Sequence, residues 1–181
     1  LRLIKKPIGI DIEQHKDRDK RIIFYKTDAI SYLKKNRKKF DLILLKQTIH
    51  FLTLKEINKL LFLSKNCLNS GGRIVIFTLA TSKNEIPTFA KMKKKLSKSL
   101  KRDQKILRFI NDLYPVGLSK IFSFKVKISR QKYVKMIQNR YISTLLNLSN
   151  AEISKGISEI NRNYRKILNF KDKLICLLLK K

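Results

Sequence analysis

The chain of 181 residues is long enough for one domain with a sizeable core, and its hydrophobic fraction of 43% excludes an intrinsically disordered protein. Its 43 basic residues against 13 acidic ones give a formal charge of +30, which has two explanations. The cations are scattered along nearly every segment, which favours a compositional drift toward lysine. Binding to nucleic acid or to an anionic membrane surface is the alternative.

The first half of the chain predicts alternating strands and helices. Strands are expected at 7–12, 22–25, 41–45 and 73–79, with a polar link at 14–20 and helices at 29–35 and after Thr53. Thr53 and Glu56 have the spacing of a capping box, and Asn69 to Gly72 is expected to end that helix in a turn. This order of elements predicts a parallel α/β sheet.

After Thr81 the chain becomes polar and basic. Residues 82–118 contain a lysine-rich helix at about 91–109, which we interpret as a lid or insertion within a single domain of residues 1–181. The remaining elements are expected to be a strand at 121–128, helices at 131–146 and 152–168, and a last strand at 174–179. A second capping box, from Ser149 to Glu152, opens the last helix.

Two cysteines, Cys67 and Cys176, each lie in an apolar run and are far apart in sequence. The sequence has no Cys-x-x-Cys pair and no His/Cys cluster, so neither a metal site nor a disulfide framework is expected. Buried free thiols in the reducing cytoplasm are the simplest interpretation. The longest apolar runs, such as 174–179, are too short to span a bilayer.

Two carboxylates follow the first two predicted strands. Asp11 ends the strand in Ile8-Gly-Ile-Asp-Ile-Glu, and a carboxylate there can accept hydrogen bonds from ribose hydroxyls, although it could also simply cap a strand end. Asp28, in Thr-Asp-Ala, fits a helix N-cap better when it is taken alone. Gly9 is the only glycine before Gly71, so the glycine-rich loop that normally precedes such an acid by about 20 residues is not in this chain.

The order and spacing of these motifs resemble the class I S-adenosylmethionine-dependent methyltransferases, in particular the type 11 branch. The similarity covers about residues 7–80 and includes Gly-Ile-Asp-Ile, Asp28-Ala29, Phe40-Asp-Leu-Ile-Leu-Leu and Leu68-Asn-Ser-Gly-Gly-Arg-Ile-Val-Ile. The segment Gln47-Thr-Ile-His-Phe is similar to a stretch of trans-aconitate methyltransferase-like enzymes. The resemblance implies an α/β, Rossmann-like sheet, N-terminally truncated without its first strand and glycine loop, with a helical insertion and a C-terminal antiparallel strand pair. Such a fragment would bind cofactor poorly and would be inactive alone.

The resemblance also implies a cofactor-binding role for five residues. Asp11 would bind both ribose hydroxyls of S-adenosylmethionine, and Ile12 would pack on the adenine. Asp28 would accept a hydrogen bond from the adenine amine, and the backbone N–H of Ala29 would meet a ring nitrogen. Leu45 would lie beside the methionine portion.

The acceptor side of the site is less defined. Gln47 and His50 would face the acceptor cavity and are the catalytic candidates, although a packed structural histidine is the favoured alternative for His50. Arg140 and Tyr141 could recognise an anionic acceptor, or could simply decorate an amphipathic helix. Lys46 is not expected to contact the cofactor, because a cation would repel the sulfonium.

These motifs favour a methyltransferase that acts on a small-molecule acceptor. A methyltransferase acting on RNA or DNA is the alternative, supported by the charge and by the basic helix at 91–109. Against it, Lys46-Gln-Thr-Ile stands where enzymes that methylate nucleobase amines carry an Asn/Asp-Pro-Pro-aromatic motif. A non-catalytic binding module with the same fold is the third hypothesis. The acceptor and the oligomeric state are not predicted.

Overall fold

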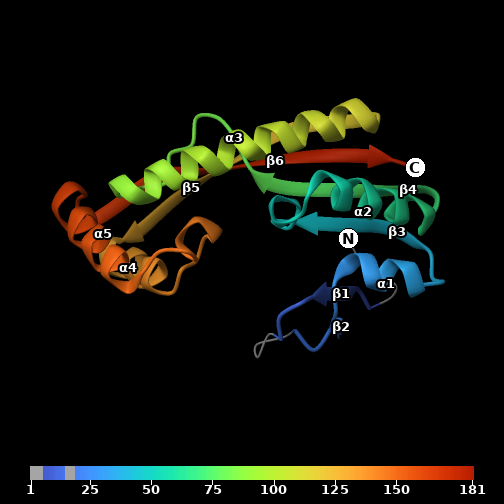
Figure 1. Cartoon of the computed structure of the whole chain (residues 1–181), viewed down its shortest axis with the longest axis horizontal. Coiled ribbons are helices and arrows are strands. Elements are labelled where there is room, and N and C mark those ends of the chain that lie inside the picture. The colour runs from blue at the N-terminus through green and yellow to red at the C-terminus, as the bar shows by residue number, and fades with distance from the viewer. Residues whose placement is uncertain (1–5, 15–18) are drawn as a thin grey trace. The chain divides into compact units, whose positions relative to one another are not determined.

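The computed structural model describes residues 6–14 and 19–181, so residues 15–18 of the expected polar link lie outside the described residues. The chain divides into two compact units, which are described separately. Figure 1 shows the helices and strands with their labels. Unit 1 takes residues 1–43, 52–74 and 180–181, and unit 2 takes residues 44–51 and 75–179. In the described part of the chain, no helix is both long and apolar enough to cross a membrane.

Unit 1 begins with a parallel pair of short strands, β1 (Ile8–Asp11) and β2 (Ile23–Lys26). The register places Ile8 opposite Ile23 and Asp11 opposite Lys26. Helix α1 (Ala29–Lys35) follows β2 directly and packs against α2 (Leu54–Asn66). The predicted strands and the predicted helix at 29–35 are therefore confirmed, to within a residue at the strand ends.

The predicted capping box at the start of α2 is confirmed. The Thr53 side chain accepts a hydrogen bond from the Glu56 N–H at 3.3 Å, and the Glu56 carboxylate accepts one from the Thr53 N–H at 2.8 Å. The buried face of α2 carries Ile57, Leu60 and Leu61 at helical spacing.

The prediction of a turn at 69–72 is wrong, because these residues belong to strand β4 (Leu68–Leu79). The helix ends earlier, at Asn66, with Cys67 as its C-cap. Gly71 has a φ of 72°, and a Cβ on Gly72 would lie 3.0 Å from the carbonyl oxygen of Phe40. The two glycines therefore let β4 start early and approach its neighbour closely, instead of forming a turn.

The second sheet has the strand order β3-β4-β6-β5, with β3 (Phe40–Lys46), β5 (Val116–Ser129) and β6 (Ile167–Lys180). Hydrogen bonds from Phe40 N–H to the Cys67 carbonyl and from Gln47 N–H to the Phe77 carbonyl advance in the same direction along both segments. That progression is the one expected of parallel strands, as the sequence predicts for β3 and β4.

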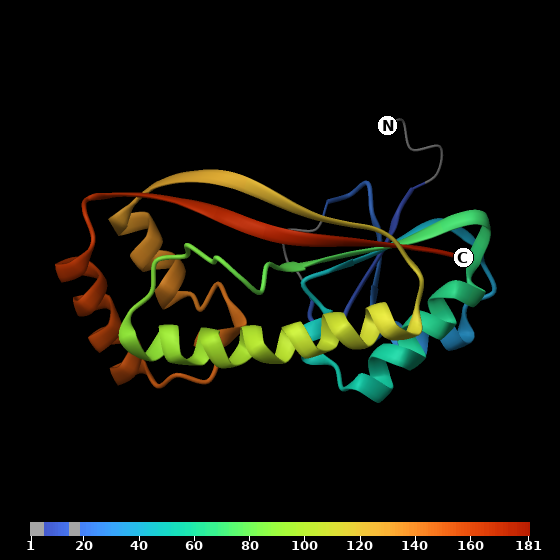
Figure 2. The same ribbon diagram turned by 90° about the horizontal axis from the view of Figure 1, so that it is seen from above.

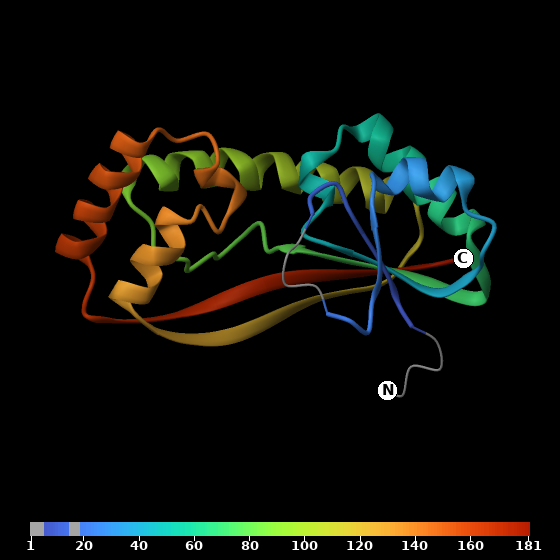
Figure 3. The same cartoon turned by 90° about the horizontal axis from the view of Figure 1, so that it is seen from below.

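Strands β5 and β6 form a long antiparallel ribbon in which Ser129 lies opposite Ile167 and Val116 opposite Leu179 (Figure 3). Both strands are longer than predicted, and the expected helix at 152–168 is correspondingly too long. Leu168 is 4% exposed and pairs with Ile128 in the ribbon, so tertiary pairing overrides its helical spacing.

Three α-helices shape unit 2: α3 (Ala90–Leu113), α4 (Arg130–Gln138) and α5 (Asn150–Asn163) (Figure 2). Short 3₁₀ turns lie at 49–51 and 143–145. The helix predicted at 131–146 stops at Gln138, because Arg140 adopts a left-handed φ of 52°. The predicted capping box from Ser149 to Glu152 is confirmed at the start of α5.

A buried cluster joins the segment before α3 to α4 and α5. It contains nine residues that are all less than 6% exposed: Phe89, Met92, Tyr133, Ile137, Leu145, Leu148, Ile153, Ile160 and Leu168. The Tyr133 hydroxyl donates to the Pro87 carbonyl at 2.6 Å, which ties the segment before α3 to α4. The Phe89 ring also packs closely on Gly156 of α5, where an added Cβ would lie 2.6 Å from ring atoms.

The close packing of Phe89 against Gly156 predicts that alanine at position 156 destabilises the protein, although alanine normally stabilises a helix relative to glycine. Alanine normally favours a helix over glycine by about 1 kcal/mol, but overpacking costs about 1–3 kcal/mol. We expect Gly156→Ala to lower the free energy of unfolding by up to about 2 kcal/mol in urea titrations, which is the overpacking cost less the gain in helix propensity. In a Phe89→Leu background the same substitution should be neutral or stabilising. A Gly156→Ala variant more stable than the parent would contradict the packing.

Candidate functional site

The carboxyl ends of β1 and β2 bring together two of the predicted cofactor-binding residues. The Thr27 N–H donates to the Asp11 carbonyl oxygen at 2.9 Å, which extends the strand pairing to the last residue of β1. Asp28 is the second residue after β2. Because the strands are parallel, both carboxylates belong to the same edge of the pair, where ligands of open α/β sheets bind.

Asp28 is the N-cap of α1, so the alternative interpretation of this residue is confirmed. Its Oδ1 accepts the Ser31 N–H at 2.8 Å. Hydrogen bonds from the side chain and the backbone of Ser31 hold the pKa of the Asp28 carboxyl below its ordinary value. The exposed carboxylate therefore stays negatively charged near neutral pH while it caps the helix.

The other predicted residues of this edge differ in exposure. Ile12 exposes 64% of its surface directly after β1, and Ala29 is half-buried at the first turn of α1. Asp11 is half-buried, and its Oδ1 accepts the Glu13 N–H at 3.0 Å. The edge thus offers two carboxylates and one exposed apolar side chain.

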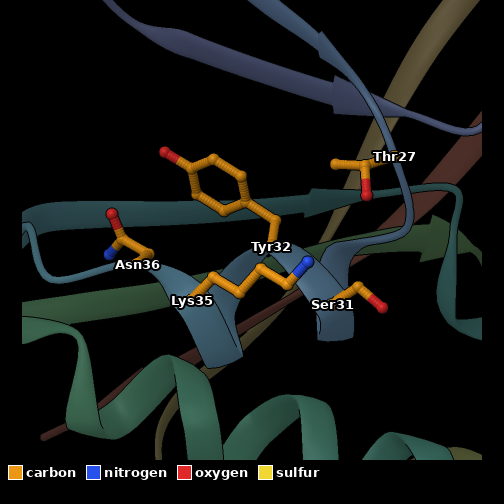
Figure 4. Close-up of a pocket in the computed structure, with 5 residues that line it drawn as sticks. All are labelled: Thr27, Ser31, Tyr32, Lys35 and Asn36. Atoms are coloured by element: carbon orange, nitrogen blue, oxygen red, sulfur yellow. The ribbon is translucent and has the colours of Figure 1, made fainter.

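A hollow of about 230 Å³ lies beside α1, lined by Thr27, Ser31, Tyr32, Lys35 and Asn36 (Figure 4). None of the predicted cofactor-binding residues lines it. Its volume is below the roughly 300–1,000 Å³ typical of small-molecule sites. A larger hollow of about 620 Å³ runs along α4 in unit 2, and the predicted acceptor residues do not line it either.

In unit 2, the end of β3 carries a strained residue. Gln47 has a φ of 54°, in the left-handed region, and its N–H donates to the Phe77 carbonyl at 2.8 Å. A non-glycine residue in this region costs about 1–2 kcal/mol, and such residues cluster at functional sites. Leu45, two residues earlier, is 7% exposed. Lys83 and Arg140 share this left-handed conformation, and a site role for Gln47 stays a prediction.

His50 lies in the 3₁₀ turn after β3 and is half-buried, with its ring centroid 4.1 Å from that of Phe51. Its Nε2 is buried and has no hydrogen-bond partner among the described residues. Burial lowers the pKa of His50 below its ordinary value, so the neutral imidazole predominates near pH 7. A neutral imidazole with an unpaired nitrogen can accept a proton.

Two residues of α3 change the pKa of His50, and no sequence motif predicts their involvement. Asp103 is 7% exposed, and its carboxylate raises the pKa of His50, whereas Arg102 lowers it. Burial raises the pKa of Asp103 itself, and Arg102, whose Nη2 lies 3.3 Å from Oδ1, opposes that shift. The sequence contains one indication that Asp103 is buried. Asp103 lies seven residues from both Leu96 and Ile110, on the helix face that carries buried residues.

Arg140 and Tyr141 contact other parts of unit 2. The Arg140 guanidinium donates to the Leu145 carbonyl at 2.5 Å and to the Asn150 side chain at 3.0 Å. The Tyr141 hydroxyl lies 2.9 Å from that of Tyr133. These contacts hold the segment between α4 and α5, and a role in acceptor recognition stays a prediction.

Among the residues that the structure describes, no group of three His, Cys, Asp or Glu side chains is placed to hold a metal ion. Cys67 and Cys176 are free and buried, as predicted.

No protein-family model matches the chain, and a search of curated proteins finds no match. Among solved structures, the chain is similar to a proposed methyltransferase from an antibiotic biosynthesis pathway of Anabaena variabilis ATCC 29413, with a TM-score of 0.54 and 10% identity over 97% of this chain and 92% of that one. It is also similar to a proposed type II methyltransferase from Anaeromyxobacter dehalogenans, with a TM-score of 0.53 and 10% identity over 97% of this chain and 80% of that one. The chain thus has the Rossmann-like fold of methyltransferases, with helices and a mixed sheet that ends in an antiparallel strand pair.

The chain covers only part of some of these structures. For the N-methyltransferase NodS from Bradyrhizobium japonicum WM9, the similarity includes 96% of this chain but 65% of that one, at 10% identity and a TM-score of 0.44.

The two α3 residues should shift the pKa of His50 in opposite directions. Asp103→Asn removes a charge that stabilises the imidazolium, so the pKa of His50 falls further. Arg102→Gln removes a repelling cation, so the same pKa rises. NMR titration of the ring protons measures both shifts, and a His15→Gln background leaves His50 as the one histidine signal. Shifts in the same direction, or no shift, would contradict this electrostatic arrangement.

Proposed function

We propose that this chain is an S-adenosylmethionine-dependent methyltransferase that methylates a small-molecule acceptor. One observation carries the proposal: the parallel pairing of β1 with β2 puts Asp11 and Asp28 at one carboxyl edge of a Rossmann-like fold. Carboxylates at that edge suit a ligand with a ribose and an exocyclic amine, since both groups donate hydrogen bonds.

In this proposal each residue of the edge has a distinct task. Asp11 accepts from both ribose hydroxyls, and Asp28 accepts from the adenine amine while it keeps its bond to Ser31. Ile12, which is 64% exposed, is covered by the adenine ring, and the Ala29 N–H meets a ring nitrogen. For Leu45, the sequence resemblance implies a role toward the methionine portion of the cofactor.

We further propose that a complete cofactor site includes one more strand with a glycine-rich loop, whose backbone N–H groups hold the carboxylate of the cofactor. Strand β3 is an edge strand of its sheet, and Leu42 and Leu44 on it are 57% and 53% exposed. An exposed apolar edge strand is normally covered by another segment. Residues 1–181 without such a segment would bind cofactor weakly and be inactive.

In this proposal the chain contributes to catalysis mainly by positioning the acceptor relative to the cofactor. The cofactor would supply an activated methyl group, and the protein must hold the acceptor atom in line with it. For an amine or phenol acceptor, the neutral His50 would take the proton that the nucleophile loses. Gln47 would orient the acceptor. For a carboxylate acceptor no base is needed, and Arg140 with Tyr141 would recognise its charge.

A cytoplasmic location fits the same proposal, since buried free thiols such as Cys67 and Cys176 suit a reducing compartment.

The ribose assignment predicts a loss of cofactor affinity when the charge of Asp11 is removed. Asp11→Asn keeps the side-chain shape but weakens charge-assisted hydrogen bonds, which contribute about 1.5–3 kcal/mol each, or about 10- to 100-fold in affinity. Calorimetry with S-adenosylhomocysteine on the protein as its gene encodes it, including any residues before Leu1, measures the change.

Asp19→Asn is the matched control, because Asp19 is an exposed acid of unit 1 that pairs with Arg21 rather than facing the edge. It should leave the affinity unchanged. Equal affinity of Asp11→Asn and the parent would contradict the ribose assignment, and no binding by the parent would contradict the cofactor.

A further inference from the structure

Five cations form one exposed line along α3, here named the α3 stripe: Lys94, Lys98, Lys101, Lys105 and Arg108. Their spacing alternates between four and three residues, which keeps successive side chains on one face of a helix. At 1.5 Å per residue the line is about 21 Å long. The helix is uninterrupted over this length (Figure 2).

The α3 stripe lacks compensating charge. None of its five cations forms an ion pair within residues 6–14 and 19–181. Of the two acids on α3, Asp103 is buried beside Arg102, and Asp112 lies beyond the stripe near the end of the helix.

Lysines on a neighbouring side of the same helix do have partners. Lys91 pairs with Glu152 of α5, and the Lys95 ammonium donates to the Asn147 carbonyl at 3.1 Å. The cations of the α3 stripe therefore differ from Lys91 and Lys95 in having no partner among the described residues. Like charges three and four residues apart destabilise a helix, so the stripe opposes the fold of α3 unless an anion neutralises it.

We propose that the α3 stripe binds the phosphate backbone of a nucleic acid. A length of about 21 Å matches roughly six nucleotides of one strand at 3.4 Å each. Four of the five cations are lysines, which contact phosphate as point charges and carry no base specificity. This binding goes beyond the proposed methyl transfer and does not depend on it.

The apolar face of α3 argues against a membrane surface as the partner. A helix that lies on a membrane inserts its apolar face between the lipid headgroups. In α3 that face is already buried inside the protein through Met92, Leu96, Ile106 and Ile110. Between Lys94 and Arg108 every exposed residue of α3 is polar or charged, which suits a phosphate backbone.

The test compares two variants that lose the same charge. The stripe variant carries Lys94→Gln, Lys98→Gln, Lys101→Gln, Lys105→Gln and Arg108→Gln. The control variant carries Lys34→Gln, Arg37→Gln, Lys38→Gln, Lys55→Gln and Lys59→Gln, five exposed cations of unit 1. Binding of fluorescein-labelled poly(U) RNA of about 20 nucleotides is followed by anisotropy across a salt series.

We expect the stripe variant to bind at least about 10-fold more weakly than the parent near 0.15 M salt, with the slope of log K against log salt reduced by about 3 units. The control variant should stay within about 3-fold, with a slope change below about 1 unit. Equal losses of RNA affinity in the two variants would overturn the proposal, because net charge alone would then explain the binding.

Vesicles containing phosphatidylserine test the membrane alternative. Loss of vesicle binding in the stripe variant, with RNA binding intact, would also overturn the proposal. Glutamine keeps helix propensity, and circular dichroism checks the fold. Should the fivefold variant misfold, a variant with only Lys98→Gln, Lys101→Gln and Lys105→Gln should show an intermediate loss of RNA affinity, and parent-like RNA affinity in that variant would overturn the proposal.

Discussion

Parallel hydrogen bonding between β1 and β2 is the constraint on which the candidate site depends. The pairing runs from Ile8 opposite Ile23 to Asp11 opposite Lys26, and the Thr27 N–H closes it on the Asp11 carbonyl. In parallel strands the carboxyl ends meet at one edge, and a register shift of one residue would turn every side chain to the other face. The neighbouring positions of Asp11 and Asp28 follow from this ladder.

In unit 2 the candidate functional features depend on helix α3, because its two faces have different chemistry. The inner face buries Asp103 near His50, where burial lowers the pKa of the imidazole and the charges of Asp103 and Arg102 adjust it in opposite directions. The outer face carries the α3 stripe, whose charge has no partner in the described chain. A single amphipathic helix thus contributes both to a candidate base and to a surface for a polyanion.

Features with local causes were predictable from the sequence. The capping boxes at Thr53 and Ser149 and the helix after Asp28 depend on residues within four positions of one another, and the structure has all three. Strand lengths were not predictable, because Leu168 and Ser129 become strand residues through partners far along the chain.

In the candidate site, too, some features were predictable from the sequence and those that depend on distant partners were not. Asp11 and Asp28 share an edge as the predicted parallel sheet requires, and their tasks toward a cofactor stay predictions. The influence of Asp103 on His50 could not be predicted, because it arises only when α3 contacts the turn at 49–51. A residue far away in sequence reaches a site through packing that no local pattern encodes.

The central claim is that the carboxyl edge of β1 and β2 binds the nucleoside part of the cofactor. Mapping amide chemical-shift changes by NMR, as S-adenosylhomocysteine is added to the protein as its gene encodes it, tests that claim most directly. The account predicts changes at the amides of Ile12, Glu13, Asp28 and Ala29, and none along the α3 stripe. Changes absent from this edge at saturating ligand would contradict it.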